Sequence, residues 1–358
     1  MDEFLVMQLG ITNRCNLGCI HCYEELQTPR DMTSQHYTTI VSKFLETADI
    51  WGKRAVVWLT GGEPLVHPDL WNFVGFLQEQ KDSGSHLSAF ILTNGVLMDE
   101  RCVSYLEKYP VVTDVQVSLD GTSESVHEAI RGKGTYKKTV DAIKLLSASK
   151  LKVHIHMVVS KENLVEAYTL PEVGLTLGVD VLTVTRLVPF GRGKAMRERM
   201  ISPEEMRSLY LMLSEKRDEF EKNGVNLLIA RNRCDWPVVF YRSDLPQEQL
   251  AKNGGHCMIG NNHFAVLEDG TVLPCRRLPV PIGNILHQDL REIFDHPLLW
   301  QFRRKHTLMK GKCRLCVFSN HLWKYCSGGA SCISYGYYED SFMPDPQCPY
   351  LMGKEAGH

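Results

Sequence analysis

Residues 15–22 read Cys-Asn-Leu-Gly-Cys-Ile-His-Cys, so three thiols stand at spacings of four and three residues. They follow an apolar run, residues 4–11, which predicts a buried strand. A tight cysteine group is typical of a site for a soft metal or an iron–sulfur cluster. A structural site normally takes four ligands, and nothing nearby in the sequence supplies a fourth. An iron without a protein ligand can hold a substrate or cofactor instead.

Cys15, Cys19 and Cys22 match the Cys-x3-Cys-x2-Cys motif of the radical S-adenosylmethionine (SAM) enzymes, and the chain resembles that family. His21 stands in the ring position usual in the family before the third cysteine. The resemblance implies that the three thiolates hold a 4Fe–4S cluster, whose fourth iron is chelated by the amino and carboxylate groups of SAM. A zinc loop or three buried thiols are the alternatives for the motif by itself.

Composition indicates a soluble globular protein, because 44% of the 358 residues are hydrophobic and 23% are charged. The formal net charge of −2 gives no general attraction to nucleic acid or to an anionic membrane. No apolar run is long enough to span a bilayer, and the N-terminus is acidic where a signal peptide is basic. We therefore expect a cytoplasmic protein, in which the twelve cysteines serve metal binding or catalysis rather than disulfides.

Strand and helix patterns alternate from the N-terminus to about residue 185. Six apolar runs predict parallel strands covered on both faces, at residues 4–11, 55–60, 87–92, 111–119, 153–159 and 179–184. Amphipathic helices are predicted between them, for example over residues 34–48 and 136–148. These units predict an α/β fold with a curved or closed parallel sheet and its chemistry at the carboxyl ends of the strands. The resemblance narrows this fold to a partial (β/α)6 TIM-like barrel.

The chain divides into four parts that differ in composition and in predicted secondary structure. We assign residues 1–200 to the barrel, 201–256 to a bridging region, 257–350 to a cysteine-rich C-terminal domain and 351–358 to a tail. The bridging region contains a predicted helix over 203–222, opened by Ser202 as N-cap and closed at Gly224. The C-terminal domain lacks a long periodic helix, so we expect metal ligation to stabilise it.

Gly61-Gly62-Glu63-Pro64 follows the second predicted strand and matches the Gly-Gly-Glu-Pro motif of the radical SAM family. The resemblance implies that backbone carbonyls of this turn and the Glu63 carboxylate bind the ammonium group of SAM. An ordinary turn between a strand and a helix is the alternative for a lone pair of glycines.

Ser118 and Asp120 end the fourth predicted strand, where they point to one side and are able to bind a ribose diol. An Asx turn is the alternative. In the family, residues at this strand end contact the ribose of SAM, and Arg131 matches an arginine that pairs with its carboxylate. The segments 93–95 and 188–193 also lie at strand ends, and we expect them to line the adenine side or the substrate opening, or to be simple turns.

The C-terminal cysteines resemble the SPASM extension of radical SAM enzymes, which holds two auxiliary 4Fe–4S clusters. The match covers the order of the cysteines, a Gly270-x4-Cys275 element and the run Cys326-Ser327-Gly328-Gly329, although two spacings are longer than in the commonest form. The candidate ligands are Cys257, Cys275, Cys313, Cys316, Cys326, Cys332 and Cys348. A four-cysteine zinc site is the alternative, but it would leave three of the seven unexplained.

Seven thiolates cannot saturate two four-iron clusters, each of which takes four cysteines. Family topology groups Cys257, Cys275 and Cys332 on the inner cluster, which leaves the other four for the outer one. The inner cluster then keeps one iron for a substrate group, a non-cysteine ligand or solvent, or Cys234. We favour an open or exchangeable position.

The resemblance implies that the chain is an enzyme that cleaves SAM reductively, producing a 5′-deoxyadenosyl radical that abstracts hydrogen from a substrate. SPASM enzymes mostly modify peptides, so we expect a ribosomally made peptide that is crosslinked, epimerised or oxidised. A sulfatase-maturating enzyme that forms formylglycine is the second hypothesis, although Arg276 stands where that group has an aspartate base. An enzyme acting on a tetrapyrrole or sugar is the third, and a non-catalytic iron–sulfur or zinc scaffold is the fourth.

The expected partners follow from the same resemblance. They are a peptide or protein substrate and an external one-electron reductant of the flavodoxin or ferredoxin type. No leader-binding domain is visible before Phe4, so we expect leader recognition from a separate protein or from the barrel itself. We expect no nucleic acid and no membrane partner, and we assign no catalytic acid or base.

Overall fold

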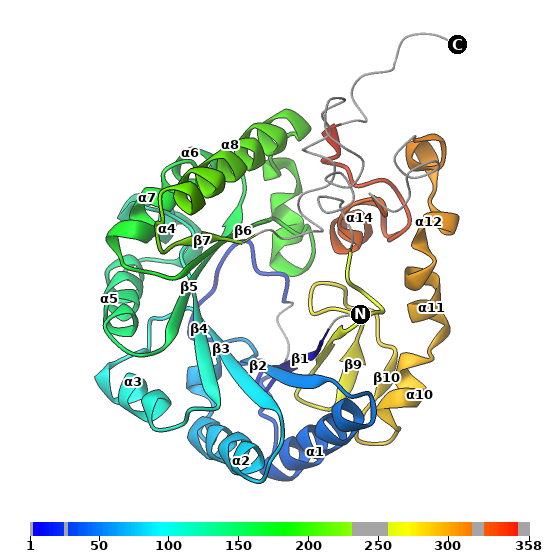
Figure 1. The fold of residues 1–358 in the computed structure, drawn as a ribbon. Coiled ribbons are helices and arrows are strands. Elements are labelled where there is room, and N and C mark those ends of the chain that lie inside the picture. Colours follow the sequence, from blue (N-terminus) through cyan, green and yellow to red (C-terminus); the bar gives the residue numbers. More distant parts are fainter. Residues whose placement is uncertain (1–2, 25–27, 231–256, 317–325, 350–358) are drawn as a thin grey trace.

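The computed structural model describes residues 3–24, 28–230, 257–316 and 326–349. Ten strands form one sheet in the order β10-β9-β8-β1-β2-β3-β4-β5-β6-β7, and the sheet curves into a ring with helices on its outer side (Figure 1). Strands β1 to β7 are parallel to their neighbours. Their carboxyl ends therefore meet at one end of the ring.

The elements alternate as the sequence predicts. The first part of the chain contains β1 (Phe4–Gly10), α1 (Ser34–Ile50), β2 (Arg54–Thr60), η1 (Pro64–Val66), α2 (Leu70–Asp82), β3 (Leu87–Thr93), α3 (Glu100–Glu107), β4 (Val112–Ser118), α4 (Glu124–Arg131), α5 (Tyr136–Ser147), β5 (Lys152–Val159), α6 (Leu164–Ala167), α7 (Leu170–Thr176), β6 (Val181–Arg186), η2 (Gly191–Arg199), α8 (Pro203–Lys222) and β7 (Leu228–Ile229). The second part contains β8 (His263–Val266), β9 (Thr271–Leu273), β10 (Gly283–Asn284), α10 (Leu290–Phe294), α11 (Pro297–Arg303), α12 (Lys305–Leu308), η3 (Gly311–Leu315) and α14 (Ser331–Tyr338).

The core lies between the sheet and the outer helices. Leu5, Met7 and Leu9 alternate along β1 and are fully buried, because they point toward the helices. Tyr37 and Phe44 of α1 are also fully buried in this core. The other face of the strands points into the ring and carries more polar residues, such as those of β5. All six predicted strands are confirmed.

The sheet extends beyond the six predicted strands at both edges. β7 pairs with β6, and β8 pairs in parallel with β1 through Val6 and His263. β9 and β10 continue this edge as antiparallel strands. Strands from the cysteine-rich region thus belong to the same sheet as the barrel. Sequence patterns missed β7 and β10 because each has only two residues.

The predicted helix over residues 203–222 is confirmed as α8. The Ser202 hydroxyl accepts a hydrogen bond from the Glu205 N–H, and the Glu205 carboxylate accepts one from the Ser202 N–H. This capping box satisfies two backbone donors at the start of the helix. Gly224 follows the C-cap with φ +67°, which a side chain would disfavour. No helix among the described residues is long and apolar enough to cross a membrane.

The last described segment contacts both sides of the ring. Phe342 stacks on Phe302 of α11, with ring centroids 5.3 Å apart. Arg186, at the end of β6, forms a bidentate ion pair with Asp345, with N–O distances of 2.9 and 2.8 Å. Both side chains are buried, at 0% and 1% exposure. A buried guanidinium–carboxylate pair therefore ties the C-terminal segment to the barrel.

We predict that Arg186→Met lowers the free energy of unfolding by about 3–5 kcal/mol, because it leaves the Asp345 carboxylate buried without its partner. Urea titration under anaerobic conditions measures this loss. Arg291→Met is the matched control, since the Arg291–Asp289 pair lies on the surface and should matter little. Equal stability of the two variants would contradict the assigned role of the buried pair.

Candidate active site

The cysteine loop leaves β1 and packs directly on the turn that follows β2. The N–H of Gly62 donates to the Thr12 carbonyl (2.8 Å) and that of Glu63 to the Arg14 carbonyl (2.9 Å). A Cβ at Gly61 would lie 2.2 Å from the Thr12 oxygen, and one at Gly62 would lie 2.3 Å from the Arg14 oxygen. Both glycines are therefore required for the two loops to approach so closely.

Glu63 joins the ends of β2 and β3. Its carboxylate accepts hydrogen bonds from the Thr93 hydroxyl (2.7 Å) and from the N–H groups of Asn94 (2.7 Å) and Leu65 (3.1 Å). Burial raises the pKa of Glu63 to about 6, although these donors stabilise the charged form. Pro64 then opens the short helix η1. At neutral pH the turn carries a buried negative charge beside the cysteine loop.

Asp120 lies just beyond β4 and is fully buried. His21 Nε2 and Arg131 Nε both lie 2.6 Å from its Oδ2 atom, and the Val158 N–H donates to Oδ1 (2.8 Å). Burial alone would raise the pKa of Asp120, but the Arg131 charge and the His21 contact hold it well below its usual value. The carboxylate thus links the cysteine loop, α4 and β5.

Two arginines approach the three thiols. Arg131 Nη1 lies 3.9 Å from the Cys19 sulfur, and Arg192 hydrogen-bonds Cys22. Burial raises the pKa of Cys19, so the free thiol holds its proton, which a bound metal must displace. The Leu17 N–H donates to the Cys15 sulfur (3.4 Å). Cationic groups and N–H donors around sulfur fit thiolates that bind an iron–sulfur cluster.

The structure brings most of the other predicted residues to this loop. His21, Gly61, Gly62, Glu63, Asp120 and Arg131 all contact the cysteine loop or one another. Ser118 ends β4 half-buried, whereas Asp120 is enclosed and both its oxygens have partners. The two side chains therefore differ in burial and in hydrogen bonding, whereas strand alternation predicted that both would point to one side and be able to bind a ribose diol.

Arg192 and Asn94 belong to the site, although the sequence analysis placed them only within broader segments. The Asn94 side chain donates to Asn16 in the cysteine loop (2.8 Å). Gly191 and Gly193 flank Arg192, and added Cβ atoms there would lie 2.4 Å from the Tyr23 oxygen and 2.8 Å from the Val188 oxygen. An arginine between two glycines at a strand end is the sequence signal that indicates this position.

The C-terminal cysteines fall into groups. Cys316 and Cys326 are close enough to Cys313 for their charges to raise its pKa, which burial brings to about 12. Burial likewise raises the pKa of Cys275, and the charge of Cys257 raises it further. Cys332 is on α14, and the Cys348 N–H bonds the Asp345 carbonyl (3.0 Å). Cys234 lies outside the described residues.

Within residues 3–24, 28–230, 257–316 and 326–349, no three Cys, His, Asp or Glu side chains converge closely enough to hold a single metal ion.

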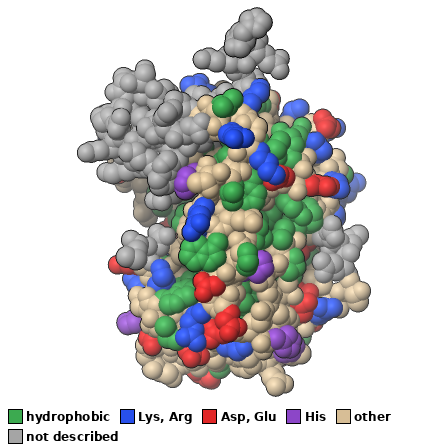
Figure 2. Space-filling view, turned by 90° about the vertical axis from the view of Figure 1, so that its right-hand side faces the viewer, with side chains coloured by type: hydrophobic (Ala, Val, Ile, Leu, Met, Phe, Trp, Pro, Cys, Tyr) green, Lys and Arg blue, Asp and Glu red, His purple; other side chains and the backbone are tan. Residues whose placement is uncertain are grey.

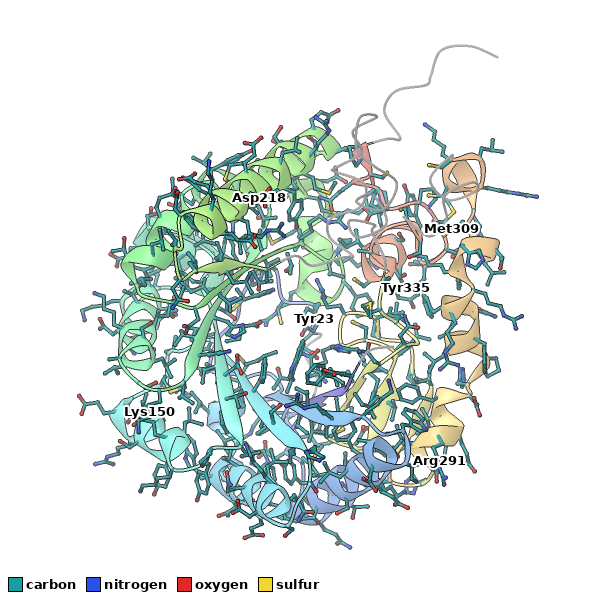
Figure 3. The ribbon with its side chains drawn as sticks, viewed as in Figure 1. Tyr23, Lys150, Asp218, Arg291, Met309 and Tyr335 are labelled. Carbon is teal, nitrogen blue, oxygen red and sulfur yellow. The ribbon has the colours of Figure 1, made fainter. Side chains whose placement is uncertain are left out.

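Arg276 connects the Cys275 turn to the cysteine loop. Its Nε lies 2.9 Å from Oε1 of Glu24, and its side chain also hydrogen-bonds Tyr23. Tyr23 follows Cys22 and lies within the ring of strands (Figure 3). A Cβ at Gly10 would lie 2.7 Å from Arg276 Nη1, so glycine at the end of β1 leaves room for the guanidinium.

The interior of the ring carries aromatic and basic side chains. Trp58 contacts Phe90 and His263, with ring centroids 6.0 and 5.3 Å apart. Among the described residues, the buried Trp58 Nε1 and His263 Nε2 atoms have no hydrogen-bond partner. Burial lowers the pKa of His156 and His263 to about 4, and the nearby Arg277 charge contributes. This interior offers hydrogen-bond donors to a ligand, and the charge of Arg277, whose side chain hydrogen-bonds Cys275, lies close by.

Comparisons with known proteins agree with this architecture. The family model for the radical SAM superfamily matches residues 9–170, and that for an iron–sulfur cluster-binding domain, SPASM, matches residues 257–317. The chain is 28% identical to an AdoMet-dependent heme synthase of Methanosarcina barkeri, over 96% of each chain. It is 31% identical to the mycofactocin maturase MftC of Mycolicibacterium smegmatis, over 99% of this chain and 85% of the relative.

Further similarities link the chain to peptide enzymes. It is 25% identical to the PqqA peptide cyclase of Gluconobacter oxydans, over 94% of this chain and 88% of the relative. The crystal structure of anSMEcpe with bound AdoMet and the Cp18Cys peptide superposes with a TM-score of 0.75 at 20% identity, covering 97% and 94% of the two chains. This last likeness establishes the fold alone.

We predict that Asp120→Asn lowers the free energy of unfolding by about 3–5 kcal/mol, because the buried Arg131 charge loses its counter-charge. Asp114→Asn serves as control, since Asp114 makes one hydrogen bond with His154 and the change should cost about 1 kcal/mol. Anaerobic urea titrations of both variants test this difference. A loss at Asp120 no greater than that at Asp114 would show that the carboxylate does not hold the loop.

Proposed function

Because the chain belongs to the radical SAM superfamily and carries the SPASM iron–sulfur domain, we propose that it cleaves SAM and modifies a ribosomally made peptide. The observation that carries this proposal is the loop with Cys15, Cys19 and Cys22, fixed at the carboxyl ends of the strands with two arginines at its thiols. A bound 4Fe–4S cluster supplies the electron that converts SAM to methionine and a 5′-deoxyadenosyl radical, which takes a hydrogen atom from the substrate.

The surrounding residues have distinct tasks in this proposal. The backbone carbonyls of Gly61 and Gly62 and the Glu63 carboxylate bind the ammonium group of SAM. Arg131 retains N–H groups beyond those directed at Asp120 and Cys19, and these bind the SAM carboxylate. His21 is held through Nε2 by Asp120, and its buried Nδ1 atom has no partner among the described residues, so it is left for the ligand.

Two further contacts complete the SAM pocket. Ser118, at the end of β4, contacts the ribose. Asp120 acts as a positioning residue, because both of its oxygens are already bound by protein donors.

The C-terminal thiols hold two auxiliary 4Fe–4S clusters in this proposal, so that the enzyme carries three clusters. The inner cluster takes Cys257, Cys275 and Cys332, and the outer one takes the remaining four of the C-terminal cysteines. Two observations support part of this grouping. Cys316 and Cys326 lie close enough to Cys313, and Cys257 to Cys275, for their charges to raise the pKa of that thiol. The enzyme also requires an external one-electron reductant.

A peptide substrate is supported by the relatives that are named as a maturase and a peptide cyclase. A separate protein that presents the leader peptide would complete recognition. Formylglycine formation is less favoured, because Arg276 is paired with Glu24 where that chemistry needs a base. A tetrapyrrole is the second candidate, since the heme synthase matches 96% of both chains. The charge of Arg277, which hydrogen-bonds Cys275 and lies near His156 and His263, favours an anionic substrate of either class.

We predict that the anaerobically reconstituted enzyme, given dithionite and SAM, releases 5′-deoxyadenosine, and that Cys19→Ala abolishes this product. Liquid chromatography with mass detection measures it. Cys102→Ala is the control. Cys102 is on α3, where its thiol lies 3.7 Å from the Leu97 carbonyl and also hydrogen-bonds Asp99, away from the cysteine loop, so the change should leave the rate unchanged. Undiminished product from Cys19→Ala would refute the cluster assignment.

The substrate is decided by the same assay with candidate substrates. A short peptide encoded beside the gene should gain a mass change and accelerate 5′-deoxyadenosine release, whereas an iron-coproporphyrin should do neither. Conversion of the porphyrin and not of the peptide would replace the first candidate with the second.

We also predict that replacing Cys15, Cys19 and Cys22 by alanine leaves about eight iron atoms per chain, from two remaining four-iron clusters. Metal analysis of protein purified without oxygen measures this content. Stoichiometric zinc with little iron would instead establish a zinc site for the C-terminal cysteines.

A further inference from the structure

The cysteine-rich region has an unusual distribution of charge. Between Asp295 and Glu339 the sequence contains no acidic residue but seven Lys and Arg residues, although the whole chain has a formal charge of −2. Four of the C-terminal cysteines, Cys313, Cys316, Cys326 and Cys332, lie within this stretch. The basic residues are therefore concentrated on one part of the C-terminal domain.

The structure places much of this charge on one surface. Arg304, Lys310, Lys312 and Arg314 are exposed, within a run that covers α12 and η3. Figure 2 views the side on which α10 to α12 lie, and Lys and Arg side chains are spread over the upper part of that face among hydrophobic ones and a few Asp and Glu. We call residues 304–315 the basic surface.

Apolar side chains are exposed within the basic surface. Leu315 is 85% exposed and Leu308 is 41% exposed. Trp300 of the adjoining α11 is 45% exposed and carries the guanidinium of Arg303 over its ring, 4.6 Å from the centroid. The charges around these apolar groups are mostly basic, although Lys310 also pairs with Asp340 at 2.6 Å. Exposed apolar groups with a charged rim are typical of a protein interaction site.

One cysteine of the proposed outer cluster, Cys313, is buried within the basic surface. Cys313 is 7% exposed, although Lys312 and Arg314 on either side of it are exposed. Lys305 points inward instead, where its ammonium donates to the Ser331 hydroxyl (2.8 Å) and its charge acts on Cys313 and Cys326. The exposed cations are thus separate from the buried one that compensates the thiolates.

We propose that the basic surface is the docking site of an acidic one-electron carrier protein, which exchanges an electron with the outer auxiliary cluster. The carrier's reduced centre loses one electron and the cluster gains it, with no bond made or broken. This proposal rests on the proposed C-terminal clusters. Charge complementarity steers association and makes its rate depend on salt, while small redox interfaces permit rapid release.

The place of the basic surface favours a carrier over other acidic partners. The exposed Lys312 and Arg314 flank Cys313, whereas the cysteine loop and the SAM pocket lie at the carboxyl ends of the barrel strands. An acidic substrate peptide would need its attracting charges at that pocket. An electron carrier needs only a short path to the cluster, which the position of Cys313 beneath the surface provides.

The test uses holoenzyme with all clusters in place and a recombinant flavodoxin as the probe. Arg304→Glu, Lys310→Glu and Lys312→Glu are combined in one variant, and stopped-flow absorbance follows electron transfer from reduced flavodoxin without SAM. The wild-type second-order rate should fall steeply as ionic strength rises above about 0.1 M, where screening acts within about 10 Å. The triple variant should be about tenfold slower at low salt, and calorimetry should show weaker binding.

The matched control reverses three exposed charges on α5, as Lys137→Glu, Lys138→Glu and Lys144→Glu, on the side of the barrel away from α12 (Figure 1). It should leave the rate and the affinity unchanged. Iron content and the electron paramagnetic resonance spectrum verify that both variants keep their clusters. If the triple Glu variant of the basic surface loses its clusters, a variant with Gln at the same three positions should give an intermediate rate of electron transfer.

Three results would overturn the proposal: a salt-independent rate, equal slowing in the α5 control, or an acidic peptide or RNA that binds the surface while flavodoxin does not. Dithionite needs no docking site, so dithionite-driven SAM cleavage should be equal in wild type and triple variant. Absence of that cleavage in wild type would refute the proposed function, whatever the flavodoxin experiment shows.

Discussion

The buried carboxylate of Asp120 is the interaction on which the site depends. One of its oxygens faces both Arg131 and His21 at 2.6 Å, and the other accepts the Val158 N–H. Three segments far apart in the sequence, the cysteine loop, α4 and β5, are thereby fixed at one point. A charge enclosed in this way must be paired, since an isolated buried charge is costly. The arrangement of Arg131 at Cys19 follows from that requirement.

Close backbone approach is the second constraint. Gly61 and Gly62 let the turn after β2 lie against the Thr12 and Arg14 carbonyls, and Gly191 lets the segment after β6 lie against Tyr23. Strand ends from both sides of the ring therefore meet around the thiols. Arg276 adds a contact from the C-terminal domain through Glu24, so both cysteine-bearing regions are joined directly. The Arg186–Asp345 pair joins them again at the other edge.

Local patterns predicted the regular elements well. The six central strands and α8 follow from apolar runs and from the Ser202 cap, because burial and capping are local signals. No local signal indicates the pairing of β8 with β1. The paired residues Val6 and His263 are distant in sequence, and β8 has only four residues. The hydrogen-bond partners of Asp120 could not be predicted for the same reason. Its spacing from Ser118 indicated a ligand, whereas its partners come from other segments.

An anaerobic crystal structure of the reconstituted enzyme with SAM tests the central claim most directly. The account predicts a four-iron cluster on Cys15, Cys19 and Cys22, with the SAM carboxylate at Arg131 and the Asp120–Arg131–His21 contacts unchanged. A cluster on other residues at this end of the barrel would contradict the account. So would SAM bound away from Arg131, or an Asp120 carboxylate released from Arg131 to bind the ligand itself.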